Sequence, residues 1–186
     1  MADRYLIVID MQNDFVTDAL GTEEAKTAVK NTVKKINGFQ GKILFTQDTH
    51  PENYLDTQEG KMLPVKHCIK GTTGWQLVPE LKAVQEQKQA PVFEKNTFGS
   101  VALAQFLLEK YQKKMVESVE LVGLCTDICV ISNALLIKAY MPELPVMVDS
   151  SCCAGVSPDK HEAALQTMES CQIILKDGRE ENDAVR

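Results

Sequence analysis

Short runs of consecutive apolar residues alternate along the chain with longer segments in which apolar residues recur at helical spacing. Residues 5–9 form the first such run, and a wholly apolar run of this length is typical of a strand buried on both faces. In residues 23–39, the apolar positions Ala25, Val29, Val33 and Ile36 recur at spacings of four, four and three. This spacing predicts a helix with one buried face.

The same two patterns repeat to the end of the chain. They predict further strands at residues 41–46, 90–94, 118–123, 144–148 and 172–175, and further helices at 78–87, 100–113, 127–141 and 158–171. Six strands separated by helices favour a mostly parallel sheet with helices on both faces. No linker or internal repeat interrupts the pattern, so we expect one domain over residues 1–186, with the polar residues 177–186 frayed.

Composition narrows the class of protein. The 186 residues carry 20 Lys+Arg and 26 Asp+Glu, and this net charge of −6 argues against a nucleic-acid partner. No apolar run approaches the roughly 18 residues that a membrane span needs, and residues 5–9 are too short for the core of a signal peptide. We therefore expect a cytoplasmic protein whose six cysteines are reduced thiols.

Three chemically capable side chains follow predicted strands. Asp10 ends the first strand, Lys95 ends the third, and Cys129 lies just past the fourth. In parallel sheets of this kind ligands bind beyond the carboxyl ends of the strands, so these three residues are candidates for one catalytic site. Asp10 is a candidate general base, because poor solvation after four aliphatic residues raises a carboxyl pKa. The alternatives are that Asp10 is a helix-cap or turn aspartate and that Lys95 is a surface lysine.

Cys129 is the candidate nucleophile. It lies in the first turn of a predicted helix that Thr126 or Asp127 can cap, where the positive end of the helix dipole lowers a thiol pKa. The alternative is a buried thiol that serves as a small apolar side chain. Cys125 is a second thiol in the preceding turn, and its backbone N–H is a candidate donor to an oxyanion.

A long irregular stretch, residues 47–74, contains candidate metal ligands. It carries Asp48, His50, Glu59 and His67, and two imidazoles with two carboxylates suit zinc first, with manganese or iron as alternatives. The competing interpretation is two solvated loop histidines. The third histidine, His161, is expected to be exposed on a late helix, and the adjacent Cys152 and Cys153 are expected to be free thiols.

Several motifs together resemble the isochorismatase-like cysteine hydrolases, and within them the nicotinamidase/pyrazinamidase branch. The matching segments are Asp10-Met-Gln-Asn-Asp-Phe15, Asp48-Thr-His50, His67-Cys-Ile-Lys-Gly71-Thr72, Lys95 and Gly123-Leu-Cys-Thr-Asp-Ile-Cys-Val130. The resemblance implies a three-layer α/β/α sandwich of Rossmann-like type around a six-stranded sheet. It also implies a catalytic triad of Asp10, Lys95 and Cys129, and a cis peptide before Cys125.

The roles that the resemblance implies are those of an amidase. A Cys129 thiolate attacks an amide carbonyl, the backbone N–H groups of Cys125 and Cys129 stabilise the oxyanion, and Asp10 moves the protons. One divalent metal ion per chain, held by Asp48, His50 and His67 and in some members also by a residue matching Glu59, binds the pyridine nitrogen of nicotinamide. Phe15 lines the ring pocket. Nicotinamide would be hydrolysed to nicotinate and ammonia in NAD salvage. We expect a homo-oligomer.

Three other functions remain open at this stage. The first is an amidase of the same fold that acts on a carbamoyl, ureido or other small amide and has no such metal set. The second is a non-catalytic metal-binding module. The third is a cysteine hydrolase in which His50 or His67 is the base.

Overall fold

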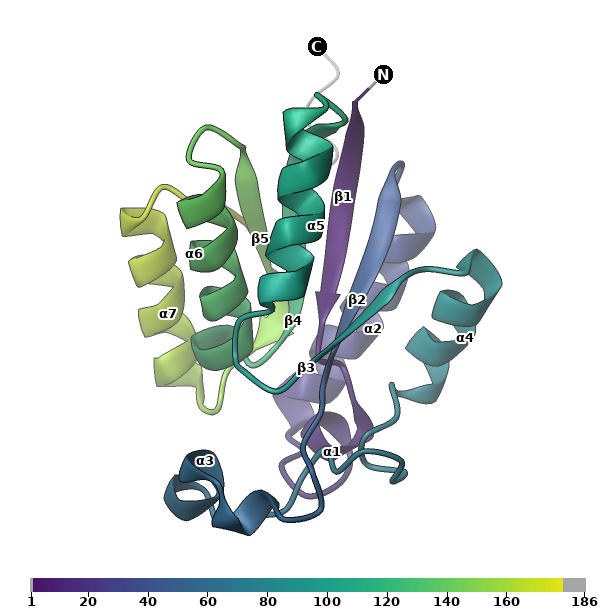
Figure 1. Cartoon of the computed structure of the whole chain (residues 1–186), viewed down its shortest axis with the longest axis vertical. Helices are drawn as coiled ribbons and strands as arrows, with labels where there is room; N and C mark the ends of the chain where they lie inside the picture. The colour runs from purple at the N-terminus through teal and green to yellow at the C-terminus, as the bar shows by residue number, and fades with distance from the viewer. Residues whose placement is uncertain (1, 179–186) are drawn as a thin grey trace.

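A parallel six-stranded sheet forms the centre of the computed structural model, which describes residues 2–178 (Figure 1). The strands are β1 (Asp3–Ile9), β2 (Lys42–Asp48), β3 (Val92–Lys95), β4 (Val116–Leu124), β5 (Val146–Ala154) and β6 (Ile174–Lys176). Their order across the sheet is β3-β2-β1-β4-β5-β6, and every neighbouring pair is parallel. The predicted parallel sheet is confirmed.

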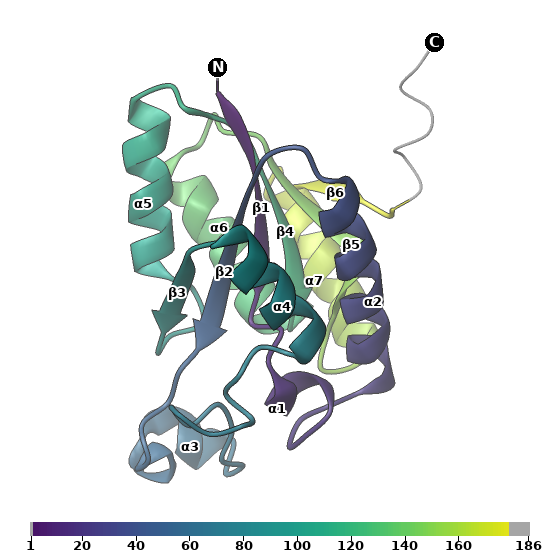
Figure 2. The ribbon, with the colours of Figure 1, turned by 90° about the vertical axis from the view of Figure 1, so that its right-hand side faces the viewer.

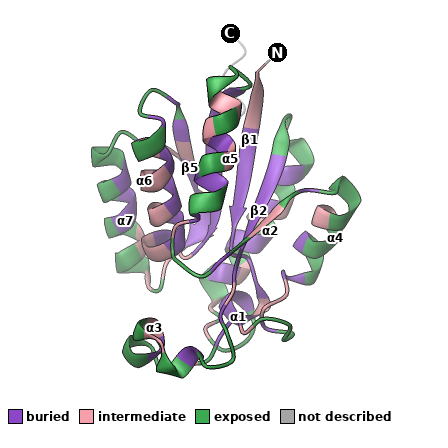
Figure 3. Ribbon diagram, viewed as in Figure 1, coloured by how far each residue is buried: buried purple, intermediate pink, exposed green. Residues whose placement is uncertain are grey.

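Helices cover both faces of this sheet. Figures 1 and 2 show α5 (Val101–Gln112), α6 (Ile131–Tyr140) and α7 (Pro158–Ser170) on one face, and α2 (Glu23–Gly38) and α4 (Pro79–Lys88) on the other. Alternate residues of β1 point to opposite faces: Ile7 and Ile9 pack with α5–α7, whereas Leu6 and Val8 pack with α2 and α4. The three-layer α/β/α sandwich is therefore confirmed, and the strands are its most buried part (Figure 3).

The strand order reverses between β1 and β4, which lie side by side at the centre of the sheet. The chain leaves these two strands on opposite sides, and ligands of open parallel sheets bind in the crevice at such a point. β1 and β4 approach closely there: Gly123 has φ of +134°, and a Cβ at this position would overlap the backbone of Ile9. Asp10 follows β1, and the segment with Cys125 and Cys129 follows β4.

Two strands continue at their carboxyl ends by two or more residues beyond the sequence prediction. β2 continues to Asp48, and β5 continues to Ala154 although residues 149–151 are polar. In β5 the carboxylate of Asp149 is buried but lies 2.8 Å from Lys35 Nζ of α2, so a polar residue can remain in the strand. Hydrophobic runs mark only the apolar part of such strands.

The long stretch predicted as irregular contains two short helices. They are η1 (Tyr54–Asp56) and α3 (Gln58–Met62), and the side chain of Thr57 caps α3 by accepting a 3.0 Å hydrogen bond from Gly60 N. The sequence pattern also did not predict α1 (Asn13–Val16). Elements of three to five residues are too short to show a helical period.

The helix predicted over residues 127–141 is divided into two elements in the structure. A π-helical turn, η2 (Thr126–Val130), precedes α6. Most of the segment predicted to fray, residues 177–186, lies outside the described residues, which end at 178. Within residues 2–178, no helix is long and apolar enough to cross a membrane.

Candidate active site

The structure brings Asp10, Lys95 and Cys129 together beyond the carboxyl ends of the strands. Lys95 Nζ lies 2.6 Å from Asp10 Oδ2 and 3.5 Å from Cys129 Sγ. The three residues are 0%, 6% and 4% exposed, respectively. A carboxylate, an ammonium group and a thiol that share one dry site can exchange a proton over short distances.

Asp10 is held in an unusual backbone conformation. Its φ of +47° is in the left-handed region, which a residue with a Cβ rarely adopts and which clusters at functional sites. The Thr46 hydroxyl accepts a hydrogen bond from Asp10 N (3.2 Å) and donates one to Asp10 Oδ1 (2.6 Å). Burial raises the pKa of Asp10, and the Lys95 charge opposes this rise. The sequence did not identify Thr46 as part of the site. Its only sequence signal is that it is a polar residue near the end of an apolar strand.

The turn that carries Cys129 is fixed by two side-chain contacts, neither of which is a helix cap. Thr126 Oγ1 lies 2.7 Å from His161 Nδ1, and Asp127 Oδ1 accepts a hydrogen bond from Val156 N at 2.9 Å. The expectation that Thr126 or Asp127 caps the helix is therefore wrong. His161 is half-buried rather than exposed, because it packs against this turn. Burial lowers the pKa of His161.

The environment of the Cys129 thiol differs from the one expected. Burial raises its pKa well above the ordinary value, the Asp10 carboxylate adds to the rise, and the Lys95 charge opposes it. The expected lowering by a helix start is wrong, because the cost of burying a thiolate outweighs it. The Leu124–Cys125 peptide bond is cis, as the resemblance implied. All six cysteines are free thiols, as expected.

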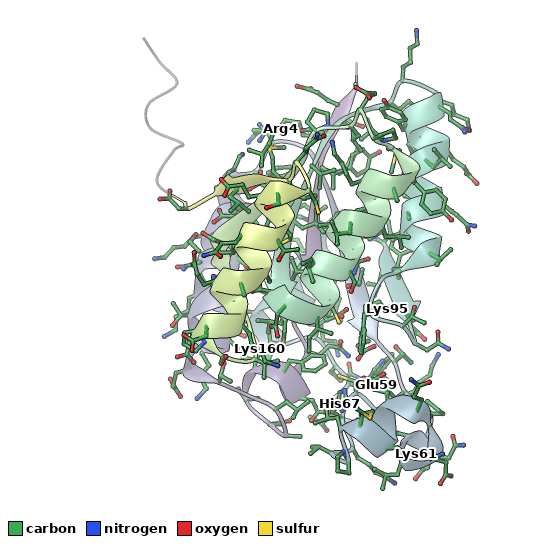
Figure 4. The ribbon with its side chains drawn as sticks, turned by 90° about the vertical axis from the view of Figure 1, so that its left-hand side faces the viewer. Arg4, Glu59, Lys61, His67, Lys95 and Lys160 are labelled. Carbon is green, nitrogen blue, oxygen red and sulfur yellow. The ribbon has the colours of Figure 1, made fainter. Side chains whose placement is uncertain are left out.

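The four candidate metal ligands form one cluster beside these residues. Their ligand atoms all lie within 4.8 Å of one another. His50 Nε2 is 3.1 Å from Asp48 Oδ2 and 3.7 Å from Glu59 Oε1, and His67 Nε2 is 3.9 Å from each of these oxygens. Figure 4 shows Glu59 and His67 close together near Lys95, whereas Arg4 marks the opposite end of the sheet.

The donor set fits a divalent cation. Both histidines are buried, so the interpretation as solvated loop residues is wrong. His67 Nδ1 lies 2.8 Å from the Val65 carbonyl, and a ring held in this way turns Nε2 toward the cluster, as a metal-binding imidazole requires. The segment is anchored to α1, where Asp14 Oδ2 accepts a hydrogen bond from Cys68 N at 2.7 Å.

Asp48 belongs to both groups of residues. Its Oδ1 lies 3.3 Å from Lys95 Nζ, and its Oδ2 lies 3.1 Å from His50 Nε2. Burial raises the pKa of Asp48, but the hydrogen bond from His50 and the charge of Lys95 outweigh it, so the pKa lies below its ordinary value. An ionised carboxylate is the form that can bind a cation.

A cavity of about 370 Å³ joins the two groups. Cys125 and Cys129 line it, and so do Asp48, Glu59 and His67 of the ligand cluster. Its apolar wall is formed by residues of several segments, among them Phe15, Leu20, Ala25, Leu124, Ile128 and Val156. Phe15 packs on His67 with ring centroids 5.4 Å apart. The space suits a small planar molecule that lies between the Cys129 thiol and the cluster of four candidate metal ligands.

Comparison with known proteins places this arrangement in a family. The family model described as the isochorismatase domain matches residues 4–178. The chain belongs to the isochorismatase family. Within this family, the nicotinamidase/pyrazinamidase of Mycobacterium tuberculosis is 27% identical over 190 residues, which cover 92% of this chain and 97% of that protein.

Solved structures of the family share the fold and most of the chain. The crystal structure of a nicotinamidase/pyrazinamidase from Bacillus subtilis superposes with a TM-score of 0.78 at 27% identity, covering 94% of this chain and 100% of that one. A pyrazinamidase from Pyrococcus horikoshii in complex with zinc gives a TM-score of 0.74 at 27% identity, with 93% and 98% covered.

Proposed function

We propose that this protein is a metal-dependent amidase that hydrolyses nicotinamide to nicotinate and ammonia through a thioester on Cys129. One observation carries the proposal: a buried thiol with an adjacent carboxylate and lysine faces a complete set of metal-type ligands across one cavity. The similarity to nicotinamidases over most of the chain supports it. The aromatic side chain of Phe15 offers a surface for a pyridine ring.

Acylation begins with a proton transfer from the thiol. The hydrogen bond between Cys129 and Asp10 gives the proton a direct route to the carboxylate, and Lys95 compensates the negative charge that forms on sulfur. The thiolate attacks the amide carbonyl carbon, and the backbone N–H groups of Cys125 and Cys129 stabilise the oxyanion. The C–N bond then breaks as Asp10 returns the proton to nitrogen, which releases ammonia.

Deacylation reverses these roles with water. Asp10 accepts a proton from a water molecule, whose oxygen attacks the thioester carbon. The C–S bond breaks, nicotinate leaves, and the thiolate recovers its proton. Because burial raises the pKa of Asp10, this carboxylate accepts a proton more readily than a free aspartate does, and it can return the proton in the next step.

Asp48, His50, Glu59 and His67 would hold one divalent ion, zinc first and manganese or iron as alternatives. When bound, such an ion offers an open coordination position to the ring nitrogen of the substrate. His67 also packs against Phe15, and this contact orients the Phe15 side chain toward the pyridine ring of the substrate. These residues lie on segments other than those of Asp10 and Cys129, so they serve substrate binding more than bond cleavage.

The cellular role follows from the reaction. Hydrolysis of nicotinamide would place the protein in NAD salvage, in the cytoplasm, with a small-molecule amide as its partner. We propose a homo-oligomer.

Ammonia release from matched amides tests the proposed function. Nicotinamide and benzamide differ only in the ring nitrogen, so nicotinamide should be hydrolysed efficiently, benzamide poorly, and a chelator should suppress only the former. Metal analysis of the purified protein should give one ion per chain. Equal turnover of the two amides, or turnover that a chelator leaves intact, would reject nicotinamide as the substrate and favour a carbamoyl or ureido amide. Bound metal without ammonia release from any amide would indicate a binding module.

A further inference from the structure

One buried side chain satisfies both backbone groups of Asp48. Gln12 Oε1 accepts a hydrogen bond from Asp48 N at 2.7 Å, and Gln12 Nε2 donates one to Asp48 O at 2.8 Å. Gln12 is 0% exposed. The primary amide thus presents the same acceptor and donor to Asp48 as a peptide group of a neighbouring strand does.

The topology explains why a side chain is needed at this point. β1 pairs with β2 as far as Val8↔Phe45, and β1 ends at Ile9, where the chain turns away at Asp10. β2 continues to Asp48, so its last residue has no strand partner on the β1 side. A buried N–H and C=O without partners are costly, and the Gln12 amide removes this cost.

We propose that Gln12 is a positioning residue that fixes the Asp48 peptide so that the Asp48 carboxylate lies in the metal site. The proposal rests on the proposed metal-dependent function. The carboxylate of Asp48 lies between two partners, Lys95 Nζ at 3.3 Å and His50 Nε2 at 3.1 Å. A small displacement of the peptide would move both carboxylate oxygens, because the side chain is short. Gln12 therefore acts on the metal site through the Asp48 backbone, since its hydrogen bonds go to the peptide N–H and C=O of Asp48 and not to its carboxylate.

The chain offers a matched control in Gln47. Gln47 Nε2 and Gln12 Nε2 both donate to the Trp75 carbonyl, at 2.6 Å and 2.8 Å, and both side chains are buried. Only Gln12 also bonds the backbone of Asp48. Methionine is similar in length to glutamine and cannot replace these hydrogen bonds. Comparing Gln12→Met with Gln47→Met therefore separates the Asp48 contacts from the shared contact to Trp75.

Zinc affinity is the primary measurement, by competition with a chromophoric chelator on the full chain. Gln12→Met should weaken zinc binding about 10–100-fold, as is typical when a group that orients a metal ligand is lost. The KM for nicotinamide should rise with it. Gln47→Met should leave zinc affinity and KM unchanged. Both variants should keep the circular dichroism spectrum of the parent.

Each contrary result has a distinct meaning. Zinc affinity unchanged in Gln12→Met, or weakened equally in both variants, overturns the role of Gln12 and leaves the proposed function standing. A wild-type chain that binds none of zinc, manganese and iron overturns both. If Gln12→Met does not fold, amide hydrogen exchange on the wild type decides: the Asp48 N–H should exchange as slowly as that of Phe45 inside β2, and fast exchange rejects the Gln12 contact.

Discussion

The two sides of the cavity are built in different ways. On the first side, called the sheet side here, Cys129 follows β4 and reaches the cavity, with Asp10 after β1 and Lys95 at the end of the edge strand β3 behind it. All three residues are almost completely buried. On the second side, called the loop side here, His50, Glu59 and His67 lie on the segment between β2 and α4. This segment packs beside the sheet rather than within it. Figure 3 shows the contrast, with buried strands above and the largely exposed α3 below.

This difference assigns different tasks to the two sides. Groups that must exchange a proton and form a bond need fixed distances, and strand ends provide them. Residues that only bind a substrate can lie on a loop, provided that buried contacts anchor the loop. The hydrogen bond from Cys68 N to Asp14 is such a contact. Changes on the sheet side should therefore act on the rate of bond cleavage, and changes on the loop side on substrate and metal binding.

The largest effect should come from the nucleophile. Cys129→Ala removes the only thiol that contacts Lys95 among residues 2–178, so turnover should fall by at least about 10⁴-fold while the fold is kept. Cys125→Ala is the matched control. This change should retain appreciable activity, because the proposed role of Cys125 uses its backbone N–H.

Alkylation checks the same assignment without a variant. Slight excess of iodoacetamide should inactivate the enzyme in step with labelling of Cys129, identified by peptide mass spectrometry. Inactivation that tracks a label on Cys125 instead would make Cys125 the nucleophile.

Asp10→Asn should lower kcat by about 10²–10⁴-fold, the usual contribution of a general base, with KM for nicotinamide little changed. Burial raises the pKa of Asp10 above that of a free aspartate, although Lys95 opposes the rise. The base must be ionised, so kcat/KM should fall as the pH drops through this raised pKa, and the residual activity of Asp10→Asn should lack this acid limb. An identical pH profile in the variant would assign the proton transfer to another group.

The sheet side was largely predictable from the sequence. Asp10 and Lys95 follow apolar runs, and in a parallel sheet the ends of such runs meet at one edge. The raised pKa of Cys129 was not predictable, because it depends on burial beside Asp10 rather than on the place of the residue in a helix. The extension of β5 was missed for a similar reason, since its buried Asp149 is stabilised by Lys35 of α2, which lies far away in the sequence.

The loop side was predictable only in its chemistry. Spacing and residue type identified Asp48, His50, Glu59 and His67 as ligand types, but not that they meet within 4.8 Å. Their convergence depends on long-range contacts, from Gln12 to Asp48 and from Asp14 to Cys68. Such contacts join residues 36 and 54 positions apart and leave no periodic signal.

His67→Ala should impair metal and substrate binding on the loop side and leave the sheet side intact. The variant should lose its bound metal, and KM for nicotinamide should rise about 10–100-fold, as expected for a lost polar contact of about 1.4–2.8 kcal/mol. Benzamide hydrolysis should change little, because this substrate has no ring nitrogen. The rate of iodoacetamide labelling at Cys129 should also stay the same. A fall in kcat for both amides, with KM unchanged, would show that the two sides are not separate in function.

Glu59→Gln should give the smallest effect on the loop side. Glu59 has a side chain 26% exposed, whereas the side chains of His50 and His67 are 5% and 2% exposed, so water can take its place in the coordination of a cation. Zinc affinity should fall by about tenfold or less, compared with complete loss in His67→Ala. Glu52→Gln, an exposed glutamate of the same segment, is the matched control and should bind zinc as the parent does. A loss in Glu59→Gln as large as that in His67→Ala would mean that the four ligands form a closed site, and such a site would have no open position for a substrate nitrogen.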